Sequence, residues 1–179
     1  MPFNFIKTYS DLLELVHLRE RERHTSLYNI FKRDIEDQVS LKFSGKFIKP
    51  IKKEGEDEMK ILFTHLTCED IEEDDGSGRL YKKRYFEIDR SRRLHWLLPH
   101  FEEKINDEII IFSAEERDQK RRVDVIKTYI YNRTHKYIIV LLPQRAPDYY
   151  FLLTAYHLNK PEGAKTIERK LKKRLNEVH

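Results

Sequence analysis

Cysteine, glycine and long apolar runs are scarce in this sequence of 179 residues, which has one cysteine, Cys68, and five glycines. A single cysteine excludes an internal disulfide framework and a zinc site built from several thiolates. No apolar run approaches the ~20 residues needed to span a membrane. The first ten residues also lack the basic start and apolar core of a signal peptide. These absences predict a reduced, cytoplasmic protein that does not enter a membrane.

Several catalytic motifs are missing as well. The sequence has no glycine-rich phosphate loop, no H-E-x-x-H and no G-x-S-x-G. Its eight histidines are scattered without the spacing of metal ligands. We therefore expect no metal ion and no cofactor, and we exclude a nucleotide-hydrolysing motor, a zinc enzyme and a serine hydrolase of the nucleophile-elbow type.

The composition is polar but compatible with a folded core. Hydrophobic residues make up 39% and charged residues 37%, and there are ten tyrosines and ten phenylalanines. The formal net charge is +4 and the isoelectric point is about 9.0. This balance mildly favours a polyanionic partner, but an ordinary charged surface explains it equally well.

Four segments in the second half of the chain have the composition of β-strands. Residues 108–113, 123–131, 136–142 and 149–156 are rich in β-branched and aromatic side chains, and short turns separate the last three. Short turns favour antiparallel pairing of successive strands. The sequence therefore predicts an α+β protein in which a helix packs on a four-stranded antiparallel meander.

Strand alternation assigns side chains to the two faces of this sheet. We expect Phe151, Leu153 and Ala155 to pack on the helix. On the other face we place Lys127, Tyr129, Thr154 and Tyr156.

Helical spacing predicts a first helix near residues 11–16, a second at 27–35 and a third at 59–66, with a hairpin at 39–48. A longer helix should begin at Asp89 or Ser91 and carry an apolar stripe to Ile105. A basic helix should begin at Pro161. Trp96 lies opposite the stripe, where we expect the N-terminal helices to bury it rather than leave it free to stack on a nucleobase.

An acidic, glycine-bearing segment divides the sequence. Residues 69–79 contain few apolar side chains, which is typical of a flexible linker. We therefore predict an N-terminal helical module with a short hairpin at residues 1–68, a linker at 69–79 and a second domain at 80–179.

The polar face predicted for the sheet suits metal-independent cleavage of RNA. The attacking 2′-hydroxyl must lose a proton, the phosphorane needs cations and the leaving 5′-oxygen needs a proton. Lys127 or Tyr156 could transfer protons, Thr154 could donate to a phosphoryl oxygen, and Tyr129 lies on the same face. Arg121 and Arg122 flank these groups. The alternative is that all are ordinary polar residues on a solvated sheet.

Two segments, residues 86–97 (FEIDRSRRLHWL) and 149–156 (YYFLLTAY), together with the strands between them, resemble the phage-associated barnase–EndoU–colicin–RelE-like nucleases. The resemblance covers residues 80 to 175. It implies an RNase-type fold of RelE-like form, an alcohol on the last strand at Thr154, and a basic helix residue at Arg93 or His95. No histidine of this sequence matches the N-terminal histidine motif of that family, so the lysine, arginine and tyrosine chemistry of RelE is the closer parallel.

The leading interpretation is a metal-independent endoribonuclease of phage or toxin type, with RNA as substrate and an antitoxin or immunity protein as partner. Two alternatives remain open. One is a catalytically inactive module that binds RNA through the same surfaces, and the other is a protein-interaction or phage-structural module.

Overall fold

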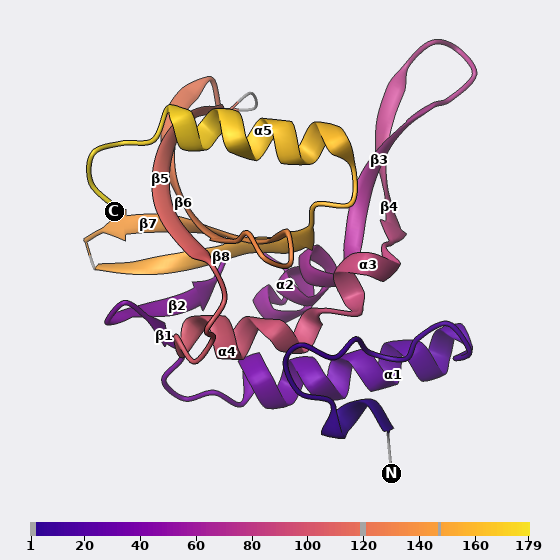
Figure 1. Cartoon of the computed structure of the whole chain (residues 1–179). Coiled ribbons are helices and arrows are strands. Elements are labelled where there is room, and N and C mark those ends of the chain that lie inside the picture. The colour runs from indigo at the N-terminus through magenta and orange to yellow at the C-terminus, as the bar shows by residue number, and fades with distance from the viewer. Residues whose placement is uncertain (1–2, 119–120, 147) are drawn as a thin grey trace.

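A six-stranded mixed sheet forms the centre of the computed structural model, which describes residues 3–118, 121–146 and 148–179 (Figure 1). The strand order is β1-β2-β8-β7-β6-β5. The strands are β1 (Lys42–Phe43), β2 (Lys46–Pro50), β5 (Ile109–Asp118), β6 (Val123–Asn132), β7 (Tyr137–Arg145) and β8 (Asp148–His157).

The α+β class is confirmed, but the sheet is larger than the four-stranded one predicted. Strands β5 to β8 pair antiparallel in succession, and β2 extends the sheet by pairing parallel with β8. The β1–β2 hairpin turns at Ser44 and Gly45, both with positive φ, as the tightest two-residue hairpins require. Sequence reasoning found this hairpin but not its pairing, because nothing local encodes a contact across about a hundred residues.

In the described residues five α-helices accompany the sheet: α1 (Glu20–Phe31), α2 (Glu58–Thr67), α3 (Ile88–Ser91), α4 (Leu97–Phe101) and α5 (Pro161–Lys172). Short 3₁₀ segments lie at η1 (Phe3–Ile6) and η3 (Leu94–Trp96), and α1 continues into a π-helical turn, η2 (Lys32–Glu36). Within the described ranges, no helix has the length and apolarity needed to cross a membrane.

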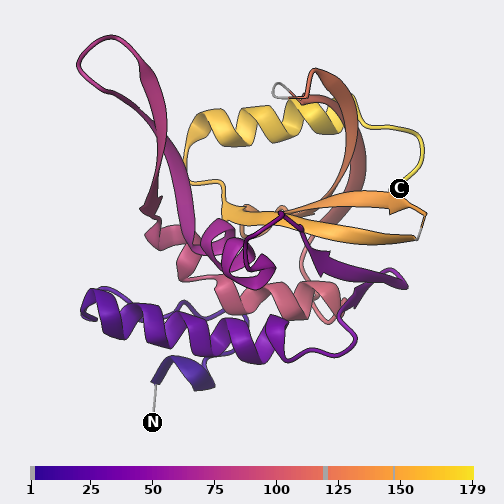
Figure 2. The same ribbon diagram turned by 180° about the vertical axis from the view of Figure 1, so that it is seen from behind.

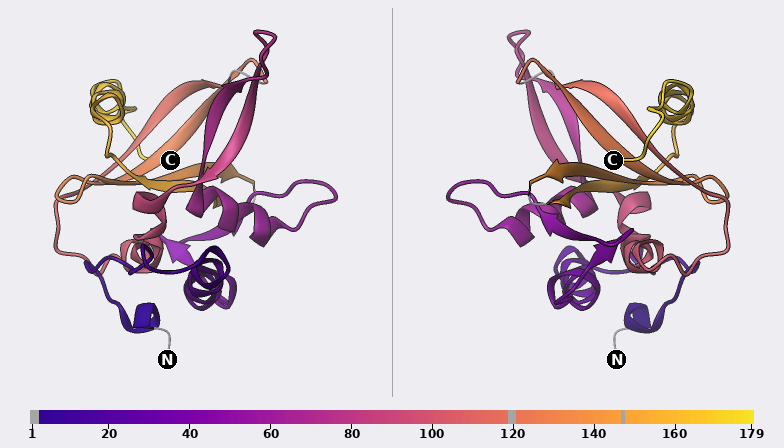
Figure 3. Two further views of the ribbon diagram at one scale, coloured as in Figure 1. Left: turned by 90° about the vertical axis from the view of Figure 1, so that its right-hand side faces the viewer. Right: turned by 90° about the vertical axis from the view of Figure 1, so that its left-hand side faces the viewer.

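The molecule has three layers. Helices α1 to α4 cover one face of the sheet and α5 covers the other, as two opposite views and an edge-on view show (Figures 1, 2 and 3). Each side has its own apolar cluster. The larger contains Leu27, Leu62, Leu97 and Ile139, and the smaller contains Ile138, Val140 and Ile167.

A β-bulge in β8 changes the predicted faces. Leu141 pairs with Leu152 and Val140 pairs with Thr154, so Leu153 is an extra residue in the strand. Beyond the bulge the alternation shifts by one position. Ala155 packs in the larger cluster as expected, whereas Leu153 packs in the smaller one under α5.

The helix predicted at residues 11–16 does not form, and the one predicted at 89–105 is interrupted, because tertiary contacts replace helical hydrogen bonds. Residues 10–15 have no regular secondary structure, because their backbone groups bond the next layer. The Leu13 amide donates to the Arg92 carbonyl at 3.0 Å, and the Trp96 indole donates to the Asp11 carbonyl at 2.9 Å. Trp96 is buried as predicted, but the irregular segment covers it together with the edge of the Tyr9 ring. The predicted longer helix is broken into α3, η3 and α4.

The predicted flexible linker is mostly a β-strand. Strand β3 (Cys68–Asp74) pairs antiparallel with β4 (Leu80–Phe86) in a hairpin that projects from the body (Figure 1). Its acidic strand faces a strand with three cations, Lys82, Lys83 and Arg84, so cross-strand attraction orders a composition that looks unstructured when read alone. The larger core cluster joins residues from both sides of the predicted boundary, such as Leu27 and Leu97.

A buried polar network ties the N-terminal segment to the sheet. Tyr9 donates a short hydrogen bond to Asp107, and the Asn132 amide nitrogen lies 2.7 Å from the Tyr9 hydroxyl, 2.8 Å from Asp107 Oδ2 and 3.1 Å from His100 Nε2. The other ring nitrogen of His100 donates to the Trp96 carbonyl. Burial lowers the pKa of His100 to about 4, so its imidazole is neutral at pH 7.

Candidate functional site

The four residues predicted as catalytic lie on the face of the sheet that α5 covers. Tyr129 and Thr154 are each paired with Val140, which packs in the cluster under α5, and Lys127 pairs with Ala114 of the same cluster. Tyr156 follows one alternation later, opposite Ile138. Strand β7 separates the two pairs, so roughly 10 Å lies between the axes of their strands.

Lys127 and Tyr129 belong to one charged cluster at the β5–β6 side. Glu116 of β5 binds Lys127 Nζ at 3.1 Å and accepts a short hydrogen bond from the Tyr129 hydroxyl. Lys170 of α5 reaches the same carboxylate at 2.7 Å and lies 3.0 Å from the Tyr129 oxygen. Two ammonium groups thus share a single carboxylate, which leaves the cluster with a net positive charge.

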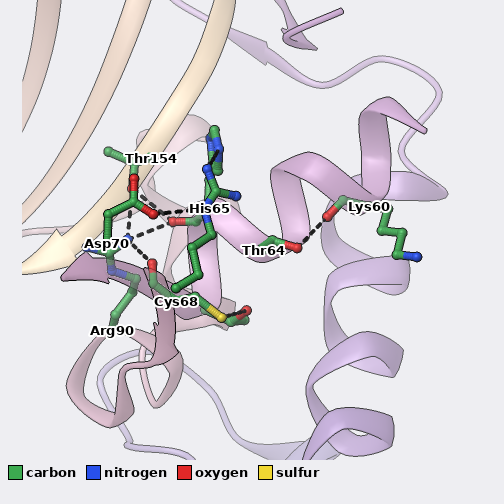
Figure 4. Close-up of polar contacts among 9 residues, drawn as sticks. Lys60, Thr64, His65, Cys68, Asp70, Arg90 and Thr154 are labelled. Carbon is green, nitrogen blue, oxygen red and sulfur yellow. Dashed lines mark hydrogen bonds and ion pairs between the residues drawn. The ribbon is translucent and has the colours of Figure 1, made fainter. Parts of the chain in front are cut away.

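Thr154 belongs to a second cluster, centred on Arg90 of α3 (Figure 4). Arg90 Nη1 donates to the carbonyls of His65 and Cys68 at 2.8 and 2.6 Å and lies 3.4 Å from Thr154 Oγ1. The Thr154 hydroxyl itself donates to the His65 carbonyl at 3.0 Å. These carbonyls come from the end of α2 and the start of β3, where the chain leaves the helix beside β8.

The charge of Arg90 is not neutralised by direct contact. Within the described part of the chain, Arg90 forms no ion pair, and its buried Nε has no hydrogen-bond partner. Burial lowers the pKa of Arg90, but a guanidinium stays protonated in proteins. The carboxylates of Glu87 and Glu69 offset part of this lowering of the pKa from a distance, and an anion in direct contact would offset more of the cost of burying the cation. This makes Arg90 the position in the cluster best suited to an anionic ligand.

Tyr156 lies between the two clusters. The Arg90 guanidinium lies 5.7 Å from the centre of its ring. Burial raises the pKa of the Tyr156 hydroxyl, and the charges of Lys170 and Arg90 act in the opposite direction. Tyr156 is therefore protonated at pH 7 and adjoins cations of both clusters.

His65 adds an unprotonated ring nitrogen next to Thr154. Its Nε2 lies 2.7 Å from Arg84 Nη2, and Arg84 in turn pairs with Asp70 at 2.8 Å. Because a guanidinium can only donate, His65 Nε2 must be the acceptor. Burial, followed by the charge of Arg84, lowers the pKa of His65 below its ordinary value, so the ring is neutral at pH 7.

The structure buries Arg93 and His95, the two helix residues for which a phosphate-binding role is predicted. Arg93 is 8% exposed and its Nη1 donates to the Asp89 carbonyl, while His95 is 3% exposed with Nε2 3.3 Å from the Thr8 carbonyl. His95 faces the N-terminal segment, whereas Arg93 also pairs with the Asp89 carboxylate at 3.7 Å and lies over the Trp96 ring. Their role is implied by the resemblance, which assumes a continuous helix here, whereas the chain forms α3, η3 and α4.

Arg121 and Arg122 are exposed but distant from the other predicted residues. They follow β5 at the turn into β6, and Arg121 lines a surface hollow shared with Asp148, the first residue of β8. Thr154 and Tyr156 lie toward the other end of that strand. These two arginines do not flank the predicted catalytic residues.

Comparison with known proteins adds no assignment. No family model, curated protein or solved structure matches this chain. The described residues also contain no group of three or more histidine, cysteine or acidic side chains that could hold a metal ion. The function must therefore be argued from the two clusters.

Sequence reasoning missed Arg90, Glu116, His65 and Lys170. Arg90 stands in the stretch DRSRR, where three arginines compete and only the position of α3 beside β8 distinguishes it. Lys170 could have been found, because α5 was predicted to be basic. Its direction toward Tyr129 depends on how the helix packs.

Proposed function

We propose that the protein binds RNA, with a backbone phosphate held at Arg90 and the positive cluster of Lys127 and Lys170 next to it. The observation that carries the proposal is Arg90, a half-buried cation without a carboxylate partner, beside the Thr154 hydroxyl and the Tyr156 ring. A phosphodiester supplies the missing negative charge, and tyrosine supplies a surface for a base.

Fluorescence anisotropy with a labelled single-stranded RNA at several salt concentrations tests this proposal. Lys170→Met should weaken binding and reduce the slope of log K against log salt by about 0.7, as expected for one lost phosphate contact. Lys165→Met is the matched control, because Lys165 is an exposed lysine of the same helix. Equal effects of the two changes would instead indicate diffuse attraction to α5.

Metal-independent cleavage of the bound RNA is the second candidate function, and His65 is the observation that favours it. If Arg84 moves onto the phosphate, His65 Nε2 is free to accept the proton of the 2′-hydroxyl as its oxygen attacks phosphorus. The protonated Tyr156 can then donate its hydroxyl proton to the leaving 5′-oxygen. The products would be a 2′,3′-cyclic phosphate and a 5′-hydroxyl end.

Cleavage is measured in EDTA with an RNA and the same oligonucleotide carrying 2′-deoxyribose. His65→Gln should lower the rate by on the order of a hundredfold, whereas His17→Gln, at an exposed histidine, should not. Magnesium-dependent cleavage, or cleavage of the deoxy strand, contradicts this mechanism. RNA binding without turnover leaves the first proposal standing alone.

The resemblance to the barnase–EndoU–colicin–RelE-like nucleases fits both candidates, and we propose the RelE-like arrangement for β5 to β8 on that basis. An antitoxin or immunity protein remains part of the nuclease proposal. Co-expression that relieves growth arrest is the assay for it.

A further inference from the structure

A pocket of about 900 Å³ opens between the start of α1, the length of α2 and the base of the β3–β4 hairpin. In Figure 2, α1 runs below α2 and below the foot of that hairpin. The pocket lies on the helical side of the molecule, away from α5 and the Glu116 cluster. Its volume is in the range of small-molecule and cofactor sites, about 300–1,000 Å³.

The lining of this pocket is strongly cationic. It contains one carboxylate, Glu20, against five cations: Arg19, Arg21, Arg23, Lys60 and Arg84. The surplus equals the net charge of +4 carried by the entire chain, so the rest of the protein is electrically balanced. Among the described residues, Arg19, Arg21 and Lys60 form no ion pair, which leaves their charges available to an anion.

Aromatic side chains lie under the cations. The Arg23 guanidinium covers the Phe86 ring at 4.0 Å, and Phe63 packs edge-on against His24 with ring centres 5.3 Å apart. A guanidinium that rests on an aromatic ring is held flat, and its outer face can stack on a planar heterocycle. The pocket thus combines several phosphate-binding groups with one stacking surface.

We propose that this pocket binds a phosphate-bearing nucleotide, with the base against Arg23 and the phosphates on the surrounding cations. The ligand is a free nucleotide or the 5′-phosphorylated end of an RNA, which share this chemistry. An acidic peptide would satisfy the cations but would leave the stacking surface unused. The site is distinct from the Arg90 cluster, although Arg84 and Cys68 border both.

Titration calorimetry of the full chain with ATP, adenosine and pyrophosphate tests the two halves of this ligand. ATP should bind, adenosine should not bind detectably, and pyrophosphate should bind at least about tenfold more weakly than ATP because it lacks a base to stack. Arg21→Gln and Lys60→Gln should each weaken ATP binding about tenfold. Both side chains are exposed, and a folded far-ultraviolet spectrum checks each variant.

Lys52→Gln is the matched control, since Lys52 is exposed and outside the pocket. Arg90→Met should also leave ATP affinity unchanged, which separates this site from the proposed RNA site. An RNA oligonucleotide with a 5′-phosphate, compared with its 5′-hydroxyl form, then identifies the source. Tighter binding of the phosphorylated RNA than of ATP indicates an RNA end, and the reverse order indicates a free nucleotide.

Three outcomes overturn the proposal. ATP and 5′-phosphorylated RNA both fail to bind, pyrophosphate binds as tightly as ATP, or the Lys52 control weakens binding as much as Arg21→Gln does.

Discussion

Two polar clusters, one around Asn132 and one around Arg90, differ in how their charges are compensated. Around Asn132 every polar group has a partner, and the carboxylate of Asp107 receives hydrogen bonds from Tyr9 and Asn132. Around Arg90, among the described residues, the cation makes its hydrogen bonds with carbonyls and a hydroxyl and forms no ion pair. Both contain a neutral histidine beside a tyrosine, so residue types alone do not tell them apart. Complete pairing indicates a structural role, and an unpaired charge at the surface indicates a place for a ligand.

Acid should destabilise the Asn132 cluster, which consists of Tyr9, His100, Asp107 and Asn132, more than the Arg90 cluster. The pKa of His100 is lowered to about 4 from an ordinary 6.5. Between these two pH values the unfolded chain therefore binds a proton at His100 that the folded chain does not bind. The stabilisation is complete above pH 6.5 and is lost as pH falls toward 4, at a cost of about 3 kcal/mol. Urea unfolding at several pH values measures this loss. The loss of unfolding free energy should be smaller in His100→Gln and unchanged in His17→Gln. An unchanged loss in both variants would show that other groups cause it.

Asn132→Ala should lower the free energy of unfolding by about 2 kcal/mol. The change leaves the buried His100 Nε2 without a donor and removes one of the two hydrogen bonds that Asp107 accepts. Asn106, an exposed asparagine in the preceding loop, is the matched control, and its alanine variant should change stability by less than about 0.5 kcal/mol. RNA affinity of the folded Asn132 variant should equal that of the wild type. A selective loss of RNA binding would contradict the structural role of this cluster.

Arg90→Met should have the opposite effect to Asn132→Ala: RNA affinity should fall while stability changes little. Removing a half-buried unpaired cation should change stability by about 1 kcal/mol or less, while RNA affinity falls about tenfold, or about 1.4 kcal/mol. Arg90→Lys should recover part of the affinity, because it restores the charge but not the fork of donors. If Arg90→Met unfolds the protein and binds RNA normally when refolded by osmolyte, the two clusters have been assigned the wrong way round.

Thr154→Val is expected to have the smallest effect. It removes the hydrogen bond from Thr154 to the His65 carbonyl and keeps the shape of the side chain, at a cost of about 1 kcal/mol. RNA affinity should stay within about twofold, because Arg90 and not the hydroxyl supplies the charge. A single-turnover cleavage assay of the same variant shows whether the hydroxyl also contributes to catalysis. A large loss of binding would make Thr154 the primary contact.

Local pattern was enough to locate the regular elements of the core. The β-branched and aromatic runs at β6, β7 and β8 encode strands, the apolar spacing at α2 encodes a helix, and Ser44-Gly45 encodes a tight turn. In each case the information lies within about ten residues, where alternation or helical periodicity acts directly on the chain. The same alternation placed Lys127, Tyr129, Thr154 and Tyr156 on one face.

Only the tertiary structure decided the rest, because the deciding interactions join distant residues. The bulge at Leu153 depends on pairing with β7, and the order in residues 69–74 depends on the basic strand that follows. The irregular segment around Asp11 takes its hydrogen bonds from Arg92 and Trp96 in place of its own helix. Arg90 stands apart from Arg92 and Arg93 only through the carbonyls at the end of α2, because a buried charge is defined by its surroundings and no residue carries those in its own sequence neighbourhood.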